Sequence, residues 1–163
     1  MDCGPSCLVM IAKYYGVRKN IDTIRHTCAL GKDGVSLLGI SKAAEEIGFK
    51  TIGGRLDFDA LAQKVPLPCV AHWNQNHFVV VYKVKKHRKG HYIVYVADPG
   101  RGLVTYTKEE FCEHWISTRT NGEDKGIALL LEPTNQFYAQ ADTKKTPTQN
   151  RAKFLWSYLK KYK

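Results

Sequence analysis

Met1-Asp-Cys-Gly-Pro-Ser-Cys-Leu-Val-Met-Ile-Ala-Lys-Tyr-Tyr-Gly16 is the stretch around which the chain is organised. Pro5 is typical of a helix start, and Gly16 predicts the helix end. A buried helical face is predicted by the apolar residues Leu8, Val9, Ile11, Ala12 and Tyr15. Cys3 would then lie at a helix N-terminus, where unpaired amide donors and the helix dipole favour thiolate over thiol. Cys3 is therefore a candidate nucleophile, and an ordinary structural cysteine is the alternative that local position leaves open.

The length and the cysteines limit the class of protein. A chain of 163 residues suits one domain. Its five cysteines are odd in number, and Cys28, Cys69 and Cys112 lie in apolar or helical patterns, which indicates a reducing compartment rather than a disulfide scaffold. No cysteines and histidines have zinc spacing, so we expect no structural metal. No signal peptide opens the chain and no apolar run approaches the roughly 20 residues that span a bilayer, so we expect a soluble segment.

The positive charge is concentrated at the C-terminal end. The formal net charge is +10, of which +7 lies between residues 144 and 163, so the rest is only mildly basic. A second basic cluster, at residues 83–89, falls in a predicted hairpin loop and is typical of a solvated turn. We therefore expect no nucleic-acid partner.

The hydrophobic period changes along the chain. After the first helix, helical spacing predicts further helices over 20–30, 36–48 and 57–64, with an extended piece at 49–56. From Pro66 the period becomes 2, which predicts an antiparallel meander of five strands, over 67–73, 77–84, 91–97, 103–107 and 126–131. A capping box from Thr107 to Glu110 predicts a helix that ends near Trp115. Helices followed by strands indicate an α+β fold, with N-terminal helices packed on an antiparallel sheet.

The last thirty residues have a different composition. Residues 134–150 are rich in Thr, Gln, Asn, Lys and Pro, which predicts a linker. Residues 151–163 mix lysines with aromatic and aliphatic residues, a basic amphipathic pattern that suits an anionic membrane surface or a partner groove. We expect this segment to lead towards a membrane domain that is not present in the chain; a frayed tail is the alternative.

His77 is the histidine with an evident acidic partner. It opens the predicted strand 77–84, whose neighbour 91–98 ends at Asp98. If the hairpin is centred between residues 87 and 88, positions whose numbers sum to 175 stand opposite each other, and His77 faces Asp98. A one-residue slip would send the two side chains to opposite faces. An Asp before Pro-Gly is by itself typical of a turn, but this pairing predicts a base and an orienting carboxylate for the thiol.

Four segments together resemble the C39 cysteine peptidase family: Asp2-Cys3-Gly4 with Cys7, Ser36-Leu-Leu-Gly-Ile-Ser-Lys-Ala-Ala-Glu-Glu-Ile-Gly-Phe49, His77-Phe-Val-Val-Val81 and Ala97-Asp98-Pro99. The resemblance covers residues 1–133 and implies a papain-like fold. It also implies that Cys3 is the nucleophile, His77 the general base and acid, and Asp98 the orienting residue.

The resemblance implies a biological role as well. The family domain lies at the N-terminus of ABC transporters that export bacteriocins and related peptides, and it cleaves leader peptides after a Gly-Gly-type site on the cytoplasmic side. The implied partners are a precursor peptide with a double-glycine leader and the membrane and ATPase domains of a homodimeric transporter. ATP and Mg would serve only those missing domains, and no cofactor is expected for the peptidase. The segment 36–49 and the adjoining sheet face are where we expect the groove for the leader.

One family feature falls outside the chain. The family places a glutamine six residues before the cysteine, where its amide helps to stabilise the oxyanion; loss of such a donor typically lowers the rate about 10²- to 10³-fold. Two alternatives remain open: the native protein carries the glutamine upstream, or this chain is a catalytically impaired module that binds the leader. A redox role for Cys3 and Cys7 is disfavoured, because residues four apart on a helix form a disulfide with difficulty.

Overall fold

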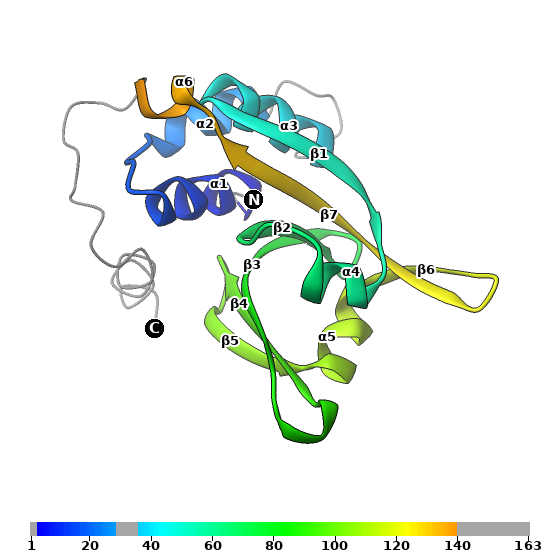
Figure 1. The fold of residues 1–163 in the computed structure, drawn as a ribbon. Coiled ribbons are helices and arrows are strands. Elements are labelled where there is room, and N and C mark those ends of the chain that lie inside the picture. The colour runs from blue at the N-terminus through cyan, green and yellow to red at the C-terminus, as the bar shows by residue number, and fades with distance from the viewer. Residues whose placement is uncertain (1–2, 29–35, 140–163) are drawn as a thin grey trace.

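The computed structural model describes residues 3–28 and 36–139 (Figure 1). In this part of the chain the helices are α1 (Cys3–Tyr14), α2 (Ile21–Cys28), α3 (Leu37–Glu46), α4 (Phe58–Gln63), α5 (Lys108–Trp115) and α6 (Asn135–Ala139). The strands are β1 (Phe49–Leu56), β2 (Cys69–Trp73), β3 (His77–Lys86), β4 (Tyr92–Asp98), β5 (Gly102–Thr107), β6 (Ile116–Thr120) and β7 (Glu123–Pro133). None of the helices in these ranges is long and apolar enough to cross a membrane.

Local hydrogen bonds explain where several helices begin. Three N-cap side chains each accept a hydrogen bond from a backbone N–H in the first turn of α3, α4 and α5, and they are Ser36, Asp57 and Thr107. These caps satisfy donors that the helix itself leaves unpaired. The chain turns away from α1 at Gly16, two residues after the helix ends, where a φ of 86° lies in the left-handed region that glycine adopts without steric cost. The predicted helices are therefore confirmed within the described residues, with small shifts at their ends, and residues 29–30 of the helix predicted over 20–30 lie outside those residues.

The sheet is antiparallel, but its order differs from the predicted meander. The strand order is β1-β7-β2-β3-β4-β5, with β6 paired to β7. The run β2 to β5 is the expected meander, whereas the prediction that residues 126–131 follow as its fifth strand is wrong. The α5 helix packs against β5, β4, β2 and β7, and it connects β5 at one edge of the sheet to β6 and β7 near the other edge. As a result β7 is inserted between β1 and β2, and the extended piece 49–56 becomes the edge strand β1.

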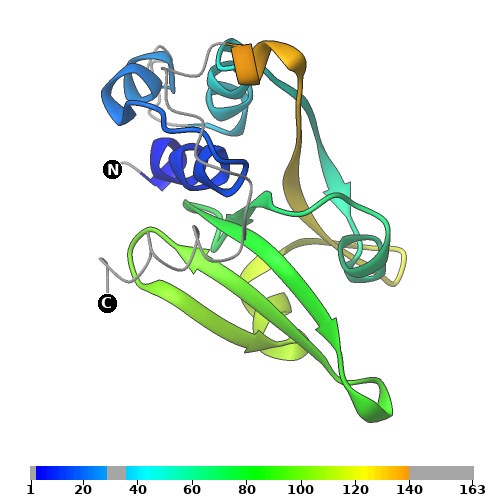
Figure 2. The ribbon, with the colours of Figure 1, turned by 60° about the vertical axis from the view of Figure 1, so that its left-hand side comes forward.

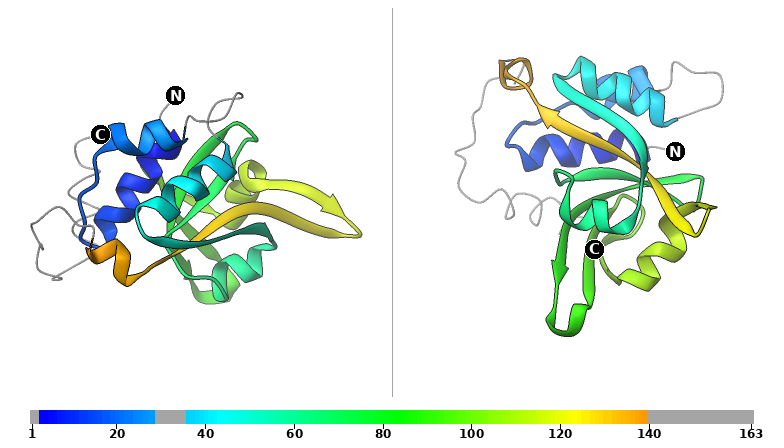
Figure 3. Two further views of the ribbon diagram at one scale, coloured as in Figure 1. Left: turned by 90° about the horizontal axis from the view of Figure 1, so that it is seen from above. Right: turned by 45° about the vertical axis from the view of Figure 1, so that its right-hand side comes forward.

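Helices cover both faces of the sheet. In β3, Phe78 and Val80 pack in the core that α1, α2 and α3 form, whereas Val79 and Val81 pack in the core that includes α4 and α5. This follows from the alternation of side chains along a strand. Figure 2 shows α1–α3 grouped on one side of the strands, and Figure 3 shows the β6–β7 hairpin extending away from the body. The predicted α+β fold is confirmed, with a second helical layer beyond the N-terminal one.

The packed body extends past residue 133. The α6 helix follows β7 within the segment 134–150 that was predicted as a linker. Its Phe137 is fully buried, with its ring centroid 4.4 Å from that of Phe49. The linker prediction is therefore wrong for residues 134–139, because an aromatic side chain anchors them to the core. The rest of the predicted linker and the basic amphipathic segment 151–163 lie outside the described residues.

Substitution of a glycine in β7 tests how α5 packs on the sheet. A Cβ at Gly126 would overlap the ring of Trp115, which is buried at the end of α5. We predict that Gly126→Ala lowers the free energy of unfolding by about 1–3 kcal/mol, because the tightly packed ring must move. Urea denaturation measures the effect. Gly54→Ala in β1 is the matched control, since nothing lies within 4 Å of its added Cβ; equal stability of the two variants would contradict the packing of α5 on β7.

Candidate active site

Cys3 is the first residue of α1, as the sequence predicts. The residue is 8% exposed, and the following residues of the helix form part of the core, including Cys7 and Leu8. The thiol therefore lies at the positive end of the helix dipole, on a helix that packing holds in place. Its position is fixed by the apolar face of α1 against β3.

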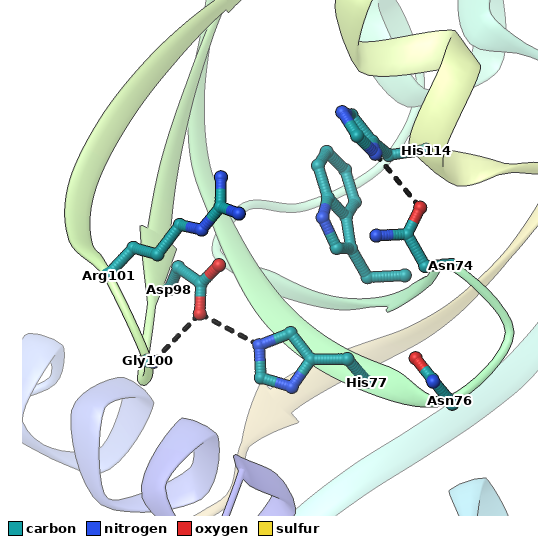
Figure 4. Close-up of a pocket in the computed structure, with 8 residues that line it drawn as sticks. Asn74, Asn76, His77, Asp98, Gly100, Arg101 and His114 are labelled. Carbon is teal, nitrogen blue, oxygen red and sulfur yellow. Dashed lines mark hydrogen bonds and ion pairs between the residues drawn. The ribbon is translucent and has the colours of Figure 1, made fainter.

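His77 and Asp98 come from the ends of neighbouring strands. His77 opens β3 and Asp98 closes β4, and the distance from His77 Nε2 to Asp98 Oδ1 is 2.8 Å. The backbone N–H of Gly100 donates to the same carboxylate oxygen, also at 2.8 Å (Figure 4). Asp98 is only 4% exposed, so its carboxylate is held by two hydrogen bonds and shielded from water. The predicted contact is present.

The register that brings them together differs from the prediction. Val80 pairs with Ala97, so opposed positions near the site sum to 177 rather than 175. His77 and Asp98 are therefore diagonal neighbours, and the prediction that they stand directly opposite is wrong. The hairpin turns at residues 88–90, later than assumed, and a bulge between Val81 and Lys83 changes the register again. Because the error is two residues, both side chains still lie on the same face of the sheet.

The charges at the site favour a thiolate. Burial raises the pKa of the Cys3 thiol, but a hydrogen bond from His77, the His77 charge and backbone N–H groups outweigh it, so the pKa lies below the usual 9.0. The hydrogen bond to Asp98, followed by that to Cys3, raises the pKa of His77 to about 9. Burial opposes ionisation of Asp98, yet its hydrogen bond with His77 and that from Gly100 leave its pKa below the ordinary value. The imidazolium of His77 thus stabilises the charged forms of Cys3 and Asp98, and these two groups in turn stabilise the charged form of His77.

The other four cysteines behave differently from Cys3. Burial raises the pKa of Cys7 well above the usual value, that of Cys28 to about 11 and that of Cys69 to about 12. Burial also raises the pKa of Cys112. Cys7 is fully buried, and its thiol donates a hydrogen bond of 3.5 Å to the carbonyl of Phe78. Among the five thiols, Cys3 alone has its pKa lowered, and Cys7 is a core residue.

A cavity of about 350 Å³ adjoins the histidine, and most of its lining was missed by the sequence analysis. Besides His77 and Asp98, the lining comprises Trp73, Asn74, Asn76, Gly100, Arg101 and His114. His114 had no evident acidic or thiol partner in the sequence. In the fold its Nδ1 lies 2.9 Å from Oδ1 of Asn74, a residue 40 positions away, and its ring stacks on Trp73. A contact so distant in sequence leaves no local pattern to detect.

These features define the class of protein. A helix-borne thiol beside a sheet-borne imidazole, on helices packed against an antiparallel sheet, is the papain-like arrangement of a cysteine peptidase. The model of the peptidase C39 family matches residues 1–133. The chain therefore belongs to the C39 family of cysteine peptidases, as the sequence motifs predict.

The relatives are processing and transport proteins. The lactococcin-G-processing and transport ATP-binding protein LagD of Lactococcus lactis is 35% identical over 83% of this chain. The colicin V secretion/processing ATP-binding protein CvaB of Escherichia coli is 35% identical over 85% of it. In both comparisons the match spans only 18% of the relative's length.

Two solved structures share the fold of this chain and are also similar to it in sequence. One is a double glycine motif protease from an AMS/PCAT transporter in complex with the leader peptide, with a TM-score of 0.66 and 32% identity over 82% of this chain and 85% of that one. The other is the peptidase domain of Streptococcus ComA, a bi-functional ABC transporter, with a TM-score of 0.63 and 28% identity over 82% of this chain and 92% of that one.

The reactivity of the thiols tests the electrostatics of the site. We predict that iodoacetamide alkylates Cys3 with an apparent pKa below 9.0, because His77 stabilises the thiolate. His77→Gln should move that apparent pKa upward, since burial then acts without the opposing charge. Mass spectrometry of tryptic peptides over a pH series measures both rates. The half-buried Cys112 is the internal control and should react only at higher pH; equal pH dependence of the two thiols would contradict the assignment.

Proposed function

We propose that Cys3, His77 and Asp98 form the catalytic triad of a thiol endopeptidase that cleaves leader peptides after a Gly-Gly-type site. The observation that carries this proposal is the contact chain from Asp98 through His77 to Cys3, with its 2.8 Å hydrogen bond and its paired pKa shifts. Membership of the C39 family supports the reaction class, and the double glycine motif of one structural relative supports the cut site.

The geometry suits acyl transfer. Nε2 of His77 bonds Asp98, which leaves Nδ1 as the ring nitrogen for Cys3. The Cys3 thiolate attacks the carbonyl carbon of the second glycine, and the His77 imidazolium then gives its proton to the leaving nitrogen of the cargo. Water next attacks the thioester, with His77 as general base, and releases the leader with a free carboxylate. Asp98 holds the ring in the orientation and tautomer that both steps need.

The backbone helps to stabilise the oxyanion. The N–H of Cys3 belongs to the first turn of α1, where helix geometry leaves it without an intrahelical acceptor. An oxyanion formed on the carbonyl at Cys3 can accept this N–H. The second donor, the glutamine that the family resemblance implies, would lie before Met1 and stays a prediction.

The wider setting of the chain is also a proposal. The names of the relatives describe processing combined with ATP-dependent transport, which supports a place for this domain in an ABC exporter. On this proposal the domain acts on a precursor peptide at the cytoplasmic face of the membrane. The homodimer, and the use of ATP and Mg by the membrane and ATPase domains, stay predictions.

A leader-binding module without peptidase activity is the alternative function. The thiol at the start of α1, with its lowered pKa and its contact to His77, favours the peptidase because a binding module needs none of these features. Retention of leader binding without cleavage by the unmodified chain would favour the module.

Replacement of the nucleophile tests the proposal. We predict that Cys3→Ala abolishes cleavage of a peptide with a Gly-Gly leader while its affinity for that leader stays near the original value, because the thiol contributes chemistry rather than binding surface. His77→Ala should have the same effect, and Asp98→Asn should leave partial activity. Chromatography of the cleaved peptide and isothermal titration of the leader measure the two quantities.

The control for this experiment is Cys112→Ala, which removes a thiol on α5 that has no role in the proposed mechanism. It should cleave the peptide as the original chain does. Cleavage that survives in Cys3→Ala would overturn the peptidase mechanism.

The pKa shifts predict the pH dependence of cleavage. kcat/KM should rise as Cys3 loses its proton, below the usual thiol pKa of 9.0, and should fall near pH 9 as His77 loses the proton that the leaving amine needs. Asp98→Asn removes the largest cause of the raised His77 pKa, so the alkaline limb should move to lower pH. Initial rates from about pH 5 to about pH 10 measure the profile. An alkaline limb that does not move in Asp98→Asn would contradict the role of Asp98.

A further inference from the structure

Apart from His77 and Asp98, the residues that line the cavity beside His77 have no role in the proposed bond-breaking steps. Its lining comes from the end of β2, the β2–β3 turn, the β4–β5 turn and α5. Cys3 is not among the lining residues, and in Figure 4 the α1 ribbon lies on the other side of His77 from Arg101 and His114. Strand alternation agrees, because His77 lies on the face that α5 covers whereas α1 packs on the opposite face. The cavity therefore opens on the side of the imidazole away from the thiol.

The mechanism of a thiol peptidase determines in which direction the peptide substrate runs through the site. The leaving nitrogen must lie against His77 to receive its proton. The acyl part of the substrate stays at Cys3, so the residues that follow the cut bond pass beyond the imidazole towards the cavity. The volume of about 350 Å³ is within the range of small ligand pockets, and the lining combines an aromatic wall with a few polar groups. Such a lining can hold a side chain of the substrate and donate hydrogen bonds to it.

The amide group of Asn74 is held in place by α5. Asn74 has a φ of 50°, a conformation that Asn tolerates better than most residues, and its backbone N–H donates to the carbonyl of His114 at 2.9 Å. Because an amide oxygen only accepts, His114 Nδ1 donates to Oδ1 of Asn74. The NH₂ group of Asn74 is left as a donor at the cavity. Asn76, on the same turn, adds a second exposed amide.

The charge of the lining is positive. Arg101 has five N–H donors, of which the Tyr106 hydroxyl accepts one. His77 adds a second positive charge at neutral pH, and Asp98 is the one acidic residue of the lining. The carboxylate of Glu110 lies near Tyr106, but it accepts a hydrogen bond of 3.2 Å from Thr107 and is not part of the lining. A substrate side chain in the cavity therefore meets donors and a net positive charge.

We propose that this cavity binds the first residues of the cargo, directly after the cut bond, and that it favours acidic or other hydrogen-bond-accepting side chains over cationic ones. The inference rests on the proposed function, because it takes the direction of the substrate from the leaving-group step. Arg101 is the residue that sets the preference, and the Asn74 and Asn76 amides supply donors to uncharged acceptors.

A peptide series tests the preference. Three peptides share one leader ending in Gly-Gly and differ only in the next residue, which is Asp, Ser or Lys. For the original chain we expect kcat/KM for the Asp peptide to exceed that for the Lys peptide about two- to fivefold, the range that exposed charge pairs support. Arg101→Gln should reduce this ratio to about one to two, because the variant keeps donors and loses the charge. Added salt should reduce the ratio for the original chain.

The matched control is Arg88→Gln, the same substitution at the exposed tip of the β3–β4 hairpin. It should keep the ratio of the original chain. Equal cleavage of the three peptides by the original chain, or an unchanged ratio in Arg101→Gln, would overturn the assignment of the cavity while the proposed function stands. Cleavage of none of the peptides would overturn the proposed function itself, and with it this inference.

Discussion

The burial of β3 on both of its faces is the constraint that places the site. Residues 78–81 are all apolar and buried, so both sides of the strand need a helical cover. The α1 helix supplies one cover and α5 contributes to the other. His77 is the first residue of this strand, at the point where both layers end. An imidazole there can contact a thiol from the α1 layer while its other side faces a cavity that α5 helps to line.

The three pKa shifts at the site have a common origin. Burial opposes the charged forms of both Cys3 and Asp98, so neither would ionise readily alone in this environment. An imidazolium between them offsets both penalties, and the same two contacts raise the pKa of His77 to about 9. The hydrogen bond from Gly100 fixes the carboxylate from the other side. Substitution of one of these three residues therefore changes the pKa of the groups that contact it. For this reason the effect of a single substitution on activity should be measured as a function of pH.

Much of this arrangement could be predicted from local chemistry. Some features depend only on residues close together in the sequence. These are the helix caps, the change of hydrophobic period near Pro66 and the thiol at a helix start. The contact between His77 and Asp98 was predicted correctly although the register was not. The register error was two residues, an even number, so both side chains lie on one face of the sheet. The position of β7, the packing of α6 and the contact of His114 with Asn74 could not be predicted, because each depends on segments far apart in the chain.

The fold also gives the two ring nitrogens of His77 different surroundings. This difference determines the direction in which a peptide substrate would lie across the site. Nε2 bonds Asp98, which leaves Nδ1 for the contact with Cys3 and, in the proposed mechanism, for the proton transfer to the leaving nitrogen. In the proposed mechanism, a peptide substrate places its acyl half at the start of α1 and its amine half beyond the ring. The turn that carries Asn74 leads directly into His77 and is tied to α5 by two hydrogen bonds. His77 and part of the cavity wall therefore lie on one turn that α5 holds in place, which in our proposal couples the choice of the residue after the cut to the proton transfer that releases it.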